Sequence, residues 1–580
     1  MDPNSRAHPQ VGIGMDLEKL ADTAPLWACI LLLLLVSFGV YANSLTGAFL
    51  SADLLRWQDT SWVDDTDFAT LISRLFVPSG GQYRPIPYTL NVIDYYLWGA
   101  NSTGFHVTNV ALNCTAVLLV FFVVFRLLTN RLTALVAAIL FATHPVHTEA
   151  VAYIAGRTDV IMAVFFLASL VFYMKFRKPD GVGSYRHYWA AIVCFLLALM
   201  SKEAAISAPL IWLTYEIYFR PRPQGEGWIS KFIYPLAPAV VIGVIYLGAQ
   251  GMAGAASSLM SKQVGWGVQA LTMTRTYSEH IWKLLLPYDL NYALIFDFNW
   301  SRSLNDPPTA GPMLLVVLLL AAVVWLWRRS RLLSFGIAWV ILSLLPISNL
   351  VALEEGPLLA ERYLYLPSLG FCLVLALVLT SPFVEGALAL SGLRWRLAAT
   401  TAMVAIVGTY SVLTVDRNRD WDSQVALLQS VVQQHPDATQ TFLAHRTMGT
   451  TYVGRGMWRE AIEEFAAALA LNPTSPEIHS DLGSVYQRVG EHDKAESEFT
   501  QAIMLNPEFA LGYLNLGTCL LRKQQFDTAA VVLAKAVDLD FTLVQAHLML
   551  SRLYEQTGDV VKAQHHAEAA ASLQNKGSGQ

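Results

Sequence analysis

The sequence predicts an all-α protein: a polytopic bundle of about eleven membrane-spanning helices, followed by a C-terminal array of helical repeats. Of the 580 residues, 54% are hydrophobic and only 14% are charged, whereas soluble domains carry roughly 25% charged residues. The last quarter differs, because 29 charged residues lie from Trp421 onward. This composition excludes a soluble cytosolic protein. The net charge of −5 lacks the basic excess of a nucleic-acid-binding protein, so no nucleic-acid partner is expected.

Long apolar runs define the membrane spans. The shorter runs would be tilted or sheltered by neighbouring helices. Residues 1–25 contain no cleavable signal peptide and are expected to be a cytoplasmic tail. The predicted spans lie at 26–42, 104–125, 132–144, 158–174, 188–201, 203–219, 232–250, 312–327, 332–347, 363–380 and 398–414.

Basic residues predict the orientation of the bundle. Five basic clusters fall on one side of an eleven-span path, which the positive-inside rule makes cytoplasmic. An odd number of spans then places the C-terminal domain on the opposite side. A helix at Leu271–Leu286 is either a further span or interfacial, and we favour interfacial because a twelfth span would divide the clusters between both sides. The clusters are Arg126 and Arg131; Lys175, Arg177, Lys178 and Arg186; Arg220, Arg222 and Lys231; Arg328, Arg329 and Arg331; and Arg394 and Arg396.

The domain organisation follows from these patterns. We expect a membrane domain over 26–420, with long external loops at 43–103 and 251–311, and a repeat domain over 421–577. Small and aromatic residues recur every 34 residues in the second domain, which is the tetratricopeptide period. A fourth, degenerate copy is expected to cap the stack. The recurring residues are Gly449, Gly483 and Gly517; Tyr452 and Tyr486; Ala461, Ala495, Ala529 and Ala563; Phe465 and Phe499; and Pro473 and Pro507.

Charged and polar residues gather at the predicted non-cytoplasmic ends of the spans. Such residues are costly at membrane depth, so a cluster of them usually serves a function. The candidate site residues are Asp53, Arg84, His106, His144, His147, Glu149, Arg157, Lys202, Glu203, Glu361 and Arg362.

Several motifs around these residues resemble one known family, the transmembrane and tetratricopeptide-repeat O-mannosyltransferases (the TMTC family) of the GT-C superfamily. The resemblance covers nearly the whole chain from Trp27 to Leu573 and includes the trailing repeats. The motifs are His144-Pro145-Val146-His147-Thr148-Glu149-Ala150-Val151, Gly156-Arg157-Thr158-Asp159, Ser201-Lys202-Glu203 and Glu361-Arg362-Tyr363-Leu364-Tyr365-Leu366-Pro367-Ser368.

The resemblance implies a GT-C-type bundle that takes a sugar from a polyprenyl-phosphate carrier on the non-cytoplasmic side. The donor would be the lipid-linked sugar, with mannose favoured, and the acceptor would be Ser or Thr of an exported protein that binds in the groove of the repeats. A phosphate leaving group benefits from cations, and an acceptor hydroxyl needs a carboxylate base. The donor and its phosphate would contact Arg84, His106, His144, His147, Glu149, Arg157, Lys202, Glu203, Glu361 and Arg362.

The family carries its base in the first external loop, usually as an acidic pair after an Asn-Ser/Gly-Phe lead-in. Here the lead-in runs from Asn43 to Phe49 and the pair reads Ala52-Asp53, so alanine occupies the first acidic position. Three interpretations stay open: Asp53 suffices as base, Ala52 is an engineered inactivating change, or the role has been lost or shifted to Asp64 or Asp65.

Simpler interpretations accompany these assignments. No metal cofactor is expected, since His144, His147 and Glu149 do not have a usual zinc spacing. Lys202 and Glu203 could form a structural ion pair, and Asp159 could pair with Arg157.

The alternative functions are a non-catalytic membrane scaffold built on the repeats and a ligase that uses a lipid-diphosphate-linked oligosaccharide. The expected location is a bacterial inner membrane with periplasmic repeats, or else the endoplasmic reticulum with lumenal repeats.

Overall fold

The computed structural model describes residues 25–50, 83–178, 181–220, 234–252, 266–288, 290, 307–348, 359–380, 392–434, 436 and 441–577. Structural statements below concern these residues. The chain divides into two compact units, Met1–Ser423 and Gln424–Gln580, close to the predicted boundary at 420/421. Each unit is described separately.

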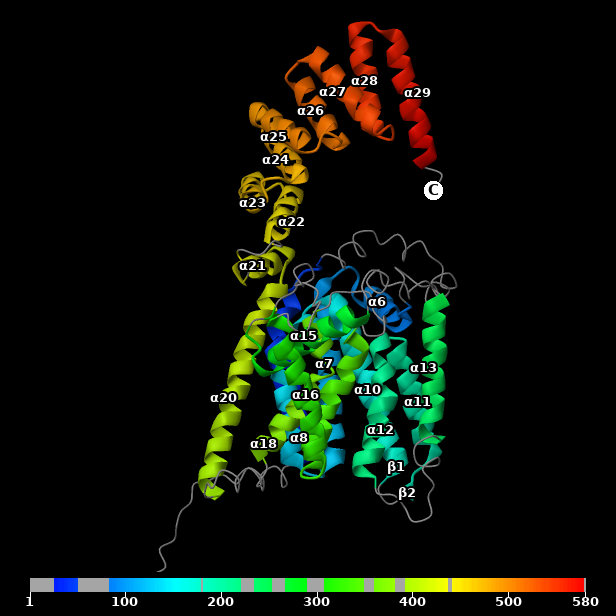
Figure 1. Ribbon diagram of the computed structural model, residues 1–580, viewed down its shortest axis with the longest axis vertical. Helices are drawn as coiled ribbons and strands as arrows, with labels where there is room; N and C mark the ends of the chain where they lie inside the picture. Colours follow the sequence, from blue (N-terminus) through cyan, green and yellow to red (C-terminus); the bar gives the residue numbers. More distant parts are fainter. Residues whose placement is uncertain are drawn as a thin grey trace, which may run out of the picture. The chain divides into compact units, whose positions relative to one another are not determined.

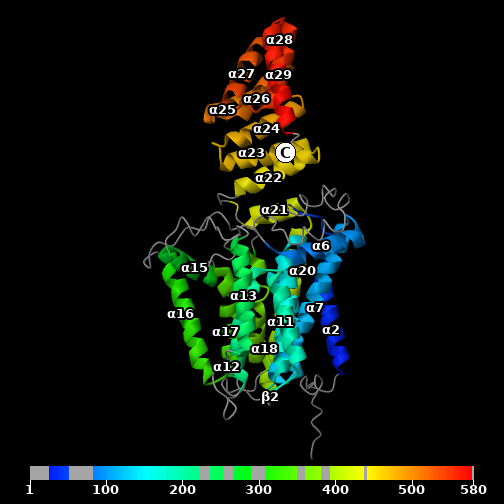
Figure 2. The ribbon, with the colours of Figure 1, turned by 90° about the vertical axis from the view of Figure 1, so that its right-hand side faces the viewer.

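The first unit is a bundle of helices with short 3-10 segments and one small hairpin (Figures 1 and 2). The hairpin pairs β1 (Arg177–Lys178) with β2 (Gly181–Val182). The 3-10 segments are η1 (Ala42–Thr46), η2 (Pro145–His147), η3 (Ile154–Gly156), η4 (Glu203–Ser207), η6 (Leu345–Ser348), η7 (Glu361–Leu364) and η8 (Arg419–Trp421). The α-helices are α2 (Leu26–Tyr41), α6 (Pro85–Trp98), α7 (Ser102–Leu128), α8 (Arg131–Thr143), α9 (Thr148–Val151), α10 (Arg157–Phe176), α11 (Tyr185–Leu199), α12 (Ala208–Phe219), α13 (Tyr234–Met252), α15 (Trp266–Leu285), α16 (Pro307–Trp327), α17 (Arg331–Leu344), α18 (Ser368–Thr380) and α20 (Gly392–Asn418).

Each predicted apolar segment is helical, but the span count of about eleven stays a prediction. Within the described ranges, five helices are long and apolar enough to cross a membrane, or six if the bent pair formed by α8 with η2 and α9 is one span. Helices such as α11, with 15 residues, and α18, with 13, are shorter than the roughly 20 residues that a bilayer core requires. No described residue of α18 is exposed, whereas α11 buries one face and exposes side chains such as Trp189 and Val193 on the other.

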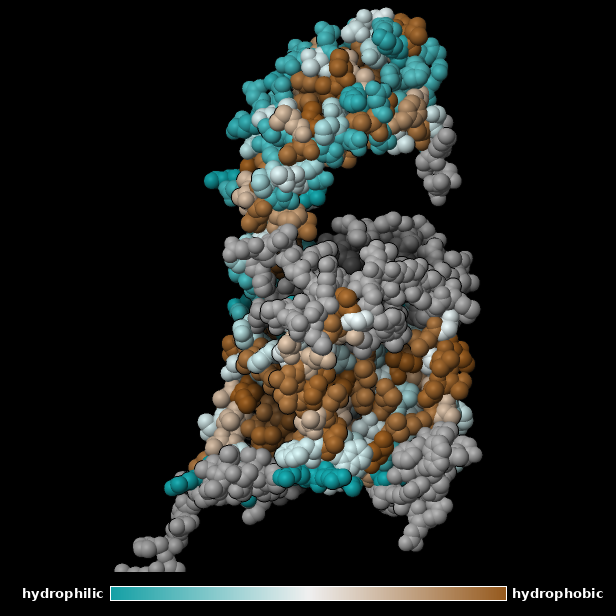
Figure 3. Space-filling view, viewed as in Figure 1, coloured by the Kyte–Doolittle hydropathy of each residue, from teal (hydrophilic) through white to brown (hydrophobic). Residues whose placement is uncertain are grey.

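The outward faces of the bundle are apolar. Side chains such as Leu35 on α2 and Val324 on α16 are 62% and 72% exposed, and brown apolar side chains form a broad belt across the face of the unit that Figure 3 shows. Large exposed apolar patches are rare on soluble monomers. The belt therefore indicates a lipid-facing surface and a multi-pass membrane protein.

Helix α15 covers the Leu271–Leu286 stretch and does not meet the length and hydropathy test for a span. Its buried side includes Thr272, Thr276 and His280, whereas Trp282 and Leu285 are exposed. The buried side of α15 also contains apolar residues such as Met273 and Leu284, so α15 packs against the protein through polar and apolar side chains together. Its interfacial placement stays a prediction.

Polar contacts tie several basic residues to one end of the bundle. Arg177, which follows α10, donates to Glu216 of α12 at 2.7 Å, and Arg220 lies 3.4 Å from the same carboxylate. Arg331, at the start of α17, donates to the backbone oxygen of Tyr218. These residues of the predicted cytoplasmic clusters therefore lie at the same end of the unit.

The second unit consists of paired antiparallel helices, which Figure 1 shows in yellow to red. The pairing confirms the predicted helical repeats. Helix α21 (Gln424–Gln434) precedes four pairs: α22 (Thr441–Gly454) with α23 (Trp458–Leu471), α24 (Pro476–Arg488) with α25 (His492–Leu505), α26 (Ala510–Arg522) with α27 (Phe526–Leu539), and α28 (Val544–Thr557) with α29 (Val560–Gly577).

The 34-residue pattern has a simple packing basis. A Cβ atom on Gly483 would lie 2.8 Å from the ring of Phe499, and one on Gly449 would lie 2.7 Å from the ring of Phe465. Both rings are buried. Glycine is therefore required in these two pairs, where the first helix meets the aromatic ring of its partner, and Gly517 meets the side chain of Leu533 in the same way in the third pair. In the fourth pair, Ser551 occupies the corresponding position.

Candidate active site at one end of the membrane unit

The His-Pro-Val-His-Thr-Glu motif bends the chain after α8. The residue before a proline disfavours the helical conformation, and His144 is extended, with φ −69° and ψ 124°. The chain turns by 55° into η2 and α9. Gly156 then packs against the backbone of Glu149 so closely that a side chain would collide with its carbonyl oxygen. The motif thus places Glu149 beside the start of α10.

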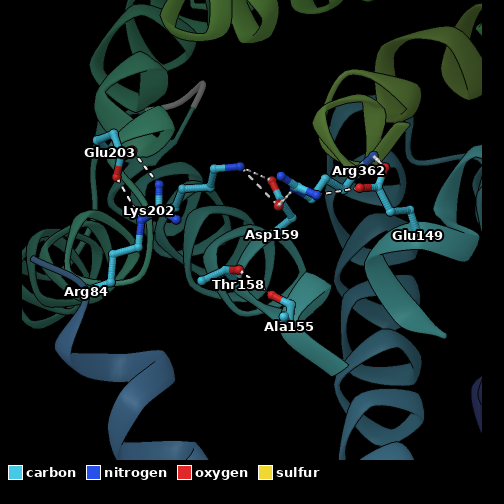
Figure 4. A network of polar contacts seen from close by, with 8 residues as sticks. All are labelled: Arg84, Glu149, Ala155, Thr158, Asp159, Lys202, Glu203 and Arg362. Atoms are coloured by element: carbon cyan, nitrogen blue, oxygen red, sulfur yellow. Dashed lines mark hydrogen bonds and ion pairs between the residues drawn. The ribbon is translucent and has the colours of Figure 1, made fainter. Parts of the chain in front are cut away.

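Asp159, in the first turn of α10, lies between two cations. Its carboxylate accepts two hydrogen bonds from Lys202 Nζ, at 2.9 and 3.0 Å, and Arg362 Nε lies 3.9 Å from its Oδ2. The Arg362 guanidinium also pairs with Glu149, whose other oxygen accepts from the Arg362 backbone N–H at 3.0 Å. Lys202, Asp159, Arg362 and Glu149 thus form a continuous chain of alternating charge (Figure 4).

A second ion pair adjoins this chain. Arg84 donates to both carboxylate oxygens of Glu203, from Nε at 3.1 Å and from Nη2 at 2.5 Å. The backbone bond from Ile86 to Met200 ties the start of α6 to the end of α11. Lys202 and Glu203 are adjacent in sequence, yet each has its described partner on another element. These partners differ from the Lys202–Glu203 ion pair that was considered from the sequence.

Tyr363 contacts both cations of the chain through its ring. Lys202 Nζ lies 4.5 Å from the ring centroid, and Arg362 Cζ lies 5.4 Å from it. The electron-rich face of an aromatic ring attracts cations. The sequence interpretation gave Tyr363 no role in holding them.

Access differs along these ion pairs. Arg84 and Arg362 are 18% and 21% exposed, whereas Lys202 and Asp159 are 1% and 3% exposed. The two arginines are thus the members of the network that a ligand could reach. Guanidinium groups match the geometry of phosphate oxygens.

Arg157 is buried in a separate polar cluster and does not pair with Asp159 as considered from the sequence. It donates to Asn109 at 2.6 Å, to Asp94 at 2.6 Å and to the backbone oxygen of Phe105 at 2.8 Å. Residues two apart on a helix point in different directions, so Arg157 and Asp159 face different neighbours. The structure gives Arg157 the role of tying α10 to α6 and α7.

The three predicted histidines are enclosed by protein. His106 Nε2 lies 3.1 Å from the backbone oxygen of Gly47, and His144 Nε2 lies 3.1 Å from that of Leu284. His147 Nε2 lies 2.7 Å from the hydroxyl of Ser368. All three side chains are buried, so the structure brings them into the packing around the network. Their contact with a donor stays a prediction.

Glu361 joins the end of α20 rather than the chain around Asp159. One of its carboxylate oxygens accepts from Arg417 at 3.2 Å, and Arg417 also pairs with Asp420 at 2.5 Å. The other oxygen of Glu361 is buried without a hydrogen-bond partner. Arg417 and Asp420 were absent from the predicted site, and only the tertiary fold brings them near Glu361.

The residues considered for the catalytic base lie in a part of the chain that the structure does not describe. Asp53 and Ala52, together with Asp64 and Asp65, fall outside the described residues. Among the residues that are described, no group of three or more His, Cys, Asp or Glu is arranged to hold a metal ion.

Family comparisons agree with this architecture. Residues 68–234 match the family described as dolichyl-phosphate-mannose-protein mannosyltransferase, and this segment contains the motifs around Glu149, Asp159 and Lys202. Residues 449–490 match the TPR repeat family, and residues 480–540 match a second tetratricopeptide repeat family.

Curated relatives share most of this chain. Human protein O-mannosyl-transferase TMTC1 is 28% identical over 75% of this chain and 54% of its own length. Human TMTC4 is 27% identical over 66% and 57%, and Drosophila melanogaster Tmtc1 is 26% identical over 77% and 61%. The matches therefore span little more than half of the relatives' own length.

Among solved structures, the crystal structure of MamA aligns at 22% identity over 29% of this chain and 96% of its own, with a TM-score of 0.26. This score is too low to support an argument. The family and sequence matches confirm the resemblance found in the motifs: this chain joins a mannosyltransferase-family domain to tetratricopeptide repeats and resembles the TMTC protein O-mannosyl-transferases.

Proposed function

We propose that this protein transfers mannose from a polyprenyl-phosphate carrier to Ser or Thr hydroxyls of exported proteins. The observation that carries the proposal is the network of ion pairs at one end of the membrane unit. Within it the guanidinium groups of Arg84 and Arg362 are the accessible cations. A lipid-linked phosphate is a suitable ligand, because such cations can stabilise a departing phosphate.

The reaction would invert the anomeric carbon in one displacement. The acceptor oxygen forms a bond to C1 of the sugar while the bond from C1 to the phosphate oxygen breaks. The leaving polyprenyl phosphate takes the electron pair, and the hydroxyl proton passes to a carboxylate base. We assign the base to Asp53 on the strength of the family resemblance.

The location of the network supports a non-cytoplasmic reaction. The network lies at the ends of α8 and α11 and at the start of α10. Arg177 lies at the opposite end of α10, and Arg220 and Arg331 lie at the same end of the unit as Arg177. Basic loops mark the cytoplasmic side. We propose the periplasmic face of a bacterial inner membrane, with the lumenal face of the endoplasmic reticulum as the alternative.

The repeat unit would bind the acceptor polypeptide. Successive first helices are linked by polar contacts, from Arg446 to Asp481 at 2.8 Å and from Asn515 to Ser480 at 3.0 Å. First helices of such arrays line an extended concave surface that suits an extended chain. This assignment is supported by the fold of the repeats and by the mannosyltransferase-family match.

A reconstituted assay tests the proposal. Vesicles that contain the protein and labelled polyprenyl-phosphate mannose should transfer label to a Ser/Thr-rich acceptor, and Asp53→Asn should reduce transfer at least about 100-fold. Asp527→Asn, the same change at an exposed position of α27, is the matched control. Undiminished transfer by Asp53→Asn would remove that residue from the mechanism.

Two further arms separate the alternatives. Competition between monophosphate and diphosphate carriers distinguishes the transferase from an oligosaccharide ligase, since the proposal requires a preference for the monophosphate. Restoring the acidic pair with Ala52→Asp tests the inactive interpretation, which a sharp gain of activity would favour. A protein that binds neither carrier, before and after that change, would instead be a scaffold.

A further inference from the structure

Asp159 connects three elements that are distant in sequence. It lies in the first turn of α10, Lys202 follows α11, and Arg362 belongs to η7. Its carboxylate accepts from Lys202 at 2.9 and 3.0 Å and lies 3.9 Å from Arg362 Nε. Figure 4 shows the two cationic side chains approaching Asp159 from opposite sides. One carboxylate thus fixes the separation of two cations.

The two cations are held differently. Lys202 is almost fully buried, and its ammonium group donates to Asp159 at 2.9 and 3.0 Å. Burying an ammonium group without a counter-charge is costly, so Asp159 allows Lys202 to occupy this position. Arg362 is 21% exposed and its contact with Asp159 is longer. Arg362 is therefore the cation with access to a ligand, and Lys202 is the fixed charge behind it.

Tyr363 completes the arrangement. Its ring lies 4.5 Å from Lys202 Nζ and 5.4 Å from Arg362 Cζ, so both cations gather around one aromatic side chain as well as one carboxylate. The phosphate of a lipid-linked sugar is an anion that two cations can bind together, but two cations repel each other unless an anion lies between them. The geometry of Asp159 supplies that anion.

We infer that Asp159 is a positioning residue that holds Lys202 and Arg362 as a paired cation site for the phosphate of the lipid donor. This inference rests on the proposed function and adds the residue that organises its phosphate site. Asp159 does not touch the donor. It acts through Arg362 and Lys202, so its loss should weaken donor binding more than it slows the bound complex.

The test compares two buried aspartates in the reconstituted assay. Asp159→Asn should raise the donor KM by about tenfold or more while kcat changes less than about threefold. Asp94→Asn is the matched control, because Asp94 is also buried and paired with an arginine, Arg157, at 2.6 Å, but it contacts neither cation of the site. It should lower the unfolding temperature while leaving the donor KM within about twofold of wild type.

Two additional variants keep the test decisive. Asp159→Glu retains the charge and should restore part of the donor affinity, so it gives the answer if Asp159→Asn does not accumulate as folded protein. In an Arg362→Ala background, Asp159→Asn should raise KM by a smaller factor than it does in the wild type, because positions that act together are not additive.

The outcomes distinguish this inference from the proposed function. Equal increases in KM for Asp159→Asn and Asp94→Asn, in step with lost stability, would reduce Asp159 to a structural residue. An unchanged KM in Asp159→Asn and Asp159→Glu would overturn the inference while wild-type transfer left the proposed function intact. An absence of donor turnover by wild type and by Ala52→Asp would defeat the proposed function itself.

Discussion

The two units use ion pairs in opposite ways. In the membrane unit, two pairs of the candidate site join residues that are far apart in sequence, by 119 positions for Arg84 and Glu203 and by 213 for Glu149 and Arg362. In the repeat unit, paired residues are neighbours in the array, such as Arg446 and Asp481, 35 positions apart. These two site pairs are therefore assembled by the whole fold, whereas the repeat contact is set by the period of the array.

Burial differs in the same direction. Arg157 and Asp94 are 1% and 2% exposed, whereas Arg446 and Asp481 are 36% and 34% exposed. Burial is the leading cause that raises the pKa of Asp481, and it outweighs the opposing effect of Arg446, so this surface pair adds little stability. A buried pair that loses one partner leaves an uncompensated charge. The comparison predicts that substitutions in ion pairs have large effects in the membrane unit and small ones on the array.

The largest effect should come from Arg157→Met. The substitution leaves Asp94 buried without its cation and removes the donor to Asn109 and to the Phe105 oxygen, so we expect a loss of about 3–5 kcal/mol. Denaturant titration in mixed micelles, followed by tryptophan fluorescence, measures it. Arg459→Met is the matched control, because Arg459 is 90% exposed and should change stability by less than about 0.5 kcal/mol. Similar losses in the two variants would break the comparison.

The second-largest loss of stability should come from a change in the packing of the repeats. Phe499→Ala empties the space that Gly483 leaves for the ring, and a buried Phe→Ala change costs about 3–4 kcal/mol. Amide hydrogen exchange of the full chain should show faster exchange in α24 and α25 while α7 and α10 stay protected. Val531→Ala, at a side chain that is 70% exposed, serves as the control. Protection unchanged by Phe499→Ala would contradict the packing argument.

The same contrast explains what could be predicted from the sequence. The repeat pattern was predictable because Gly449, Gly483 and their aromatic partners obey one local period, and the apolar runs predicted the helices for a similar reason. The membrane charges could be placed at one end of the bundle, but their partners could not. Arg84 finds Glu203, and Asp159 finds Lys202, through packing that leaves no local signal.

One error was avoidable. Arg157 and Asp159 were considered as partners because they are close in sequence, yet residues two apart on a helix do not face each other. The side chains of Arg157 and Asp159 therefore contact different residues. The histidines are a different case. A His-Pro-Val-His motif carries no signal for whether its rings face a ligand or the packed interior, and although His144 and His147 are buried, their contact with a donor stays a prediction.

The smallest effect concerns pH and the last repeat. In the second repeat, His479 Nδ1 lies 2.6 Å from Glu498. At the equivalent place in the fourth repeat, His547 Nδ1 lies 3.0 Å from His566 Nδ1. His547 Nε2 faces the backbone oxygen of Phe541, 3.2 Å away. That oxygen requires a proton on Nε2, so a neutral His547 accepts through Nδ1 from His566.

Protonation of both rings would therefore set two positive charges against each other. Burial first, and then neighbouring histidines, lower the pKa of His566 below 6.5. The pKa of His547 is also lowered, chiefly by burial. The unfolded chain then binds more protons than the folded repeat as pH falls. The fourth repeat therefore keeps its full stability above about pH 6.5 and loses part of that stability as the pH falls below this value.

We expect the α28–α29 pair to lose roughly 0.5–1 kcal/mol between pH 7.5 and 5.5, a modest change because His566 is partly exposed. Hydrogen exchange of α28 and α29 at the two pH values, corrected for the intrinsic rate, measures the change. His566→Glu recreates the pairing of the second repeat and should abolish the loss, since a carboxylate attracts the protonated ring of His547. If the variant and wild type lose protection equally, the histidine pair is not the cause, and the fourth repeat responds to pH as the others do.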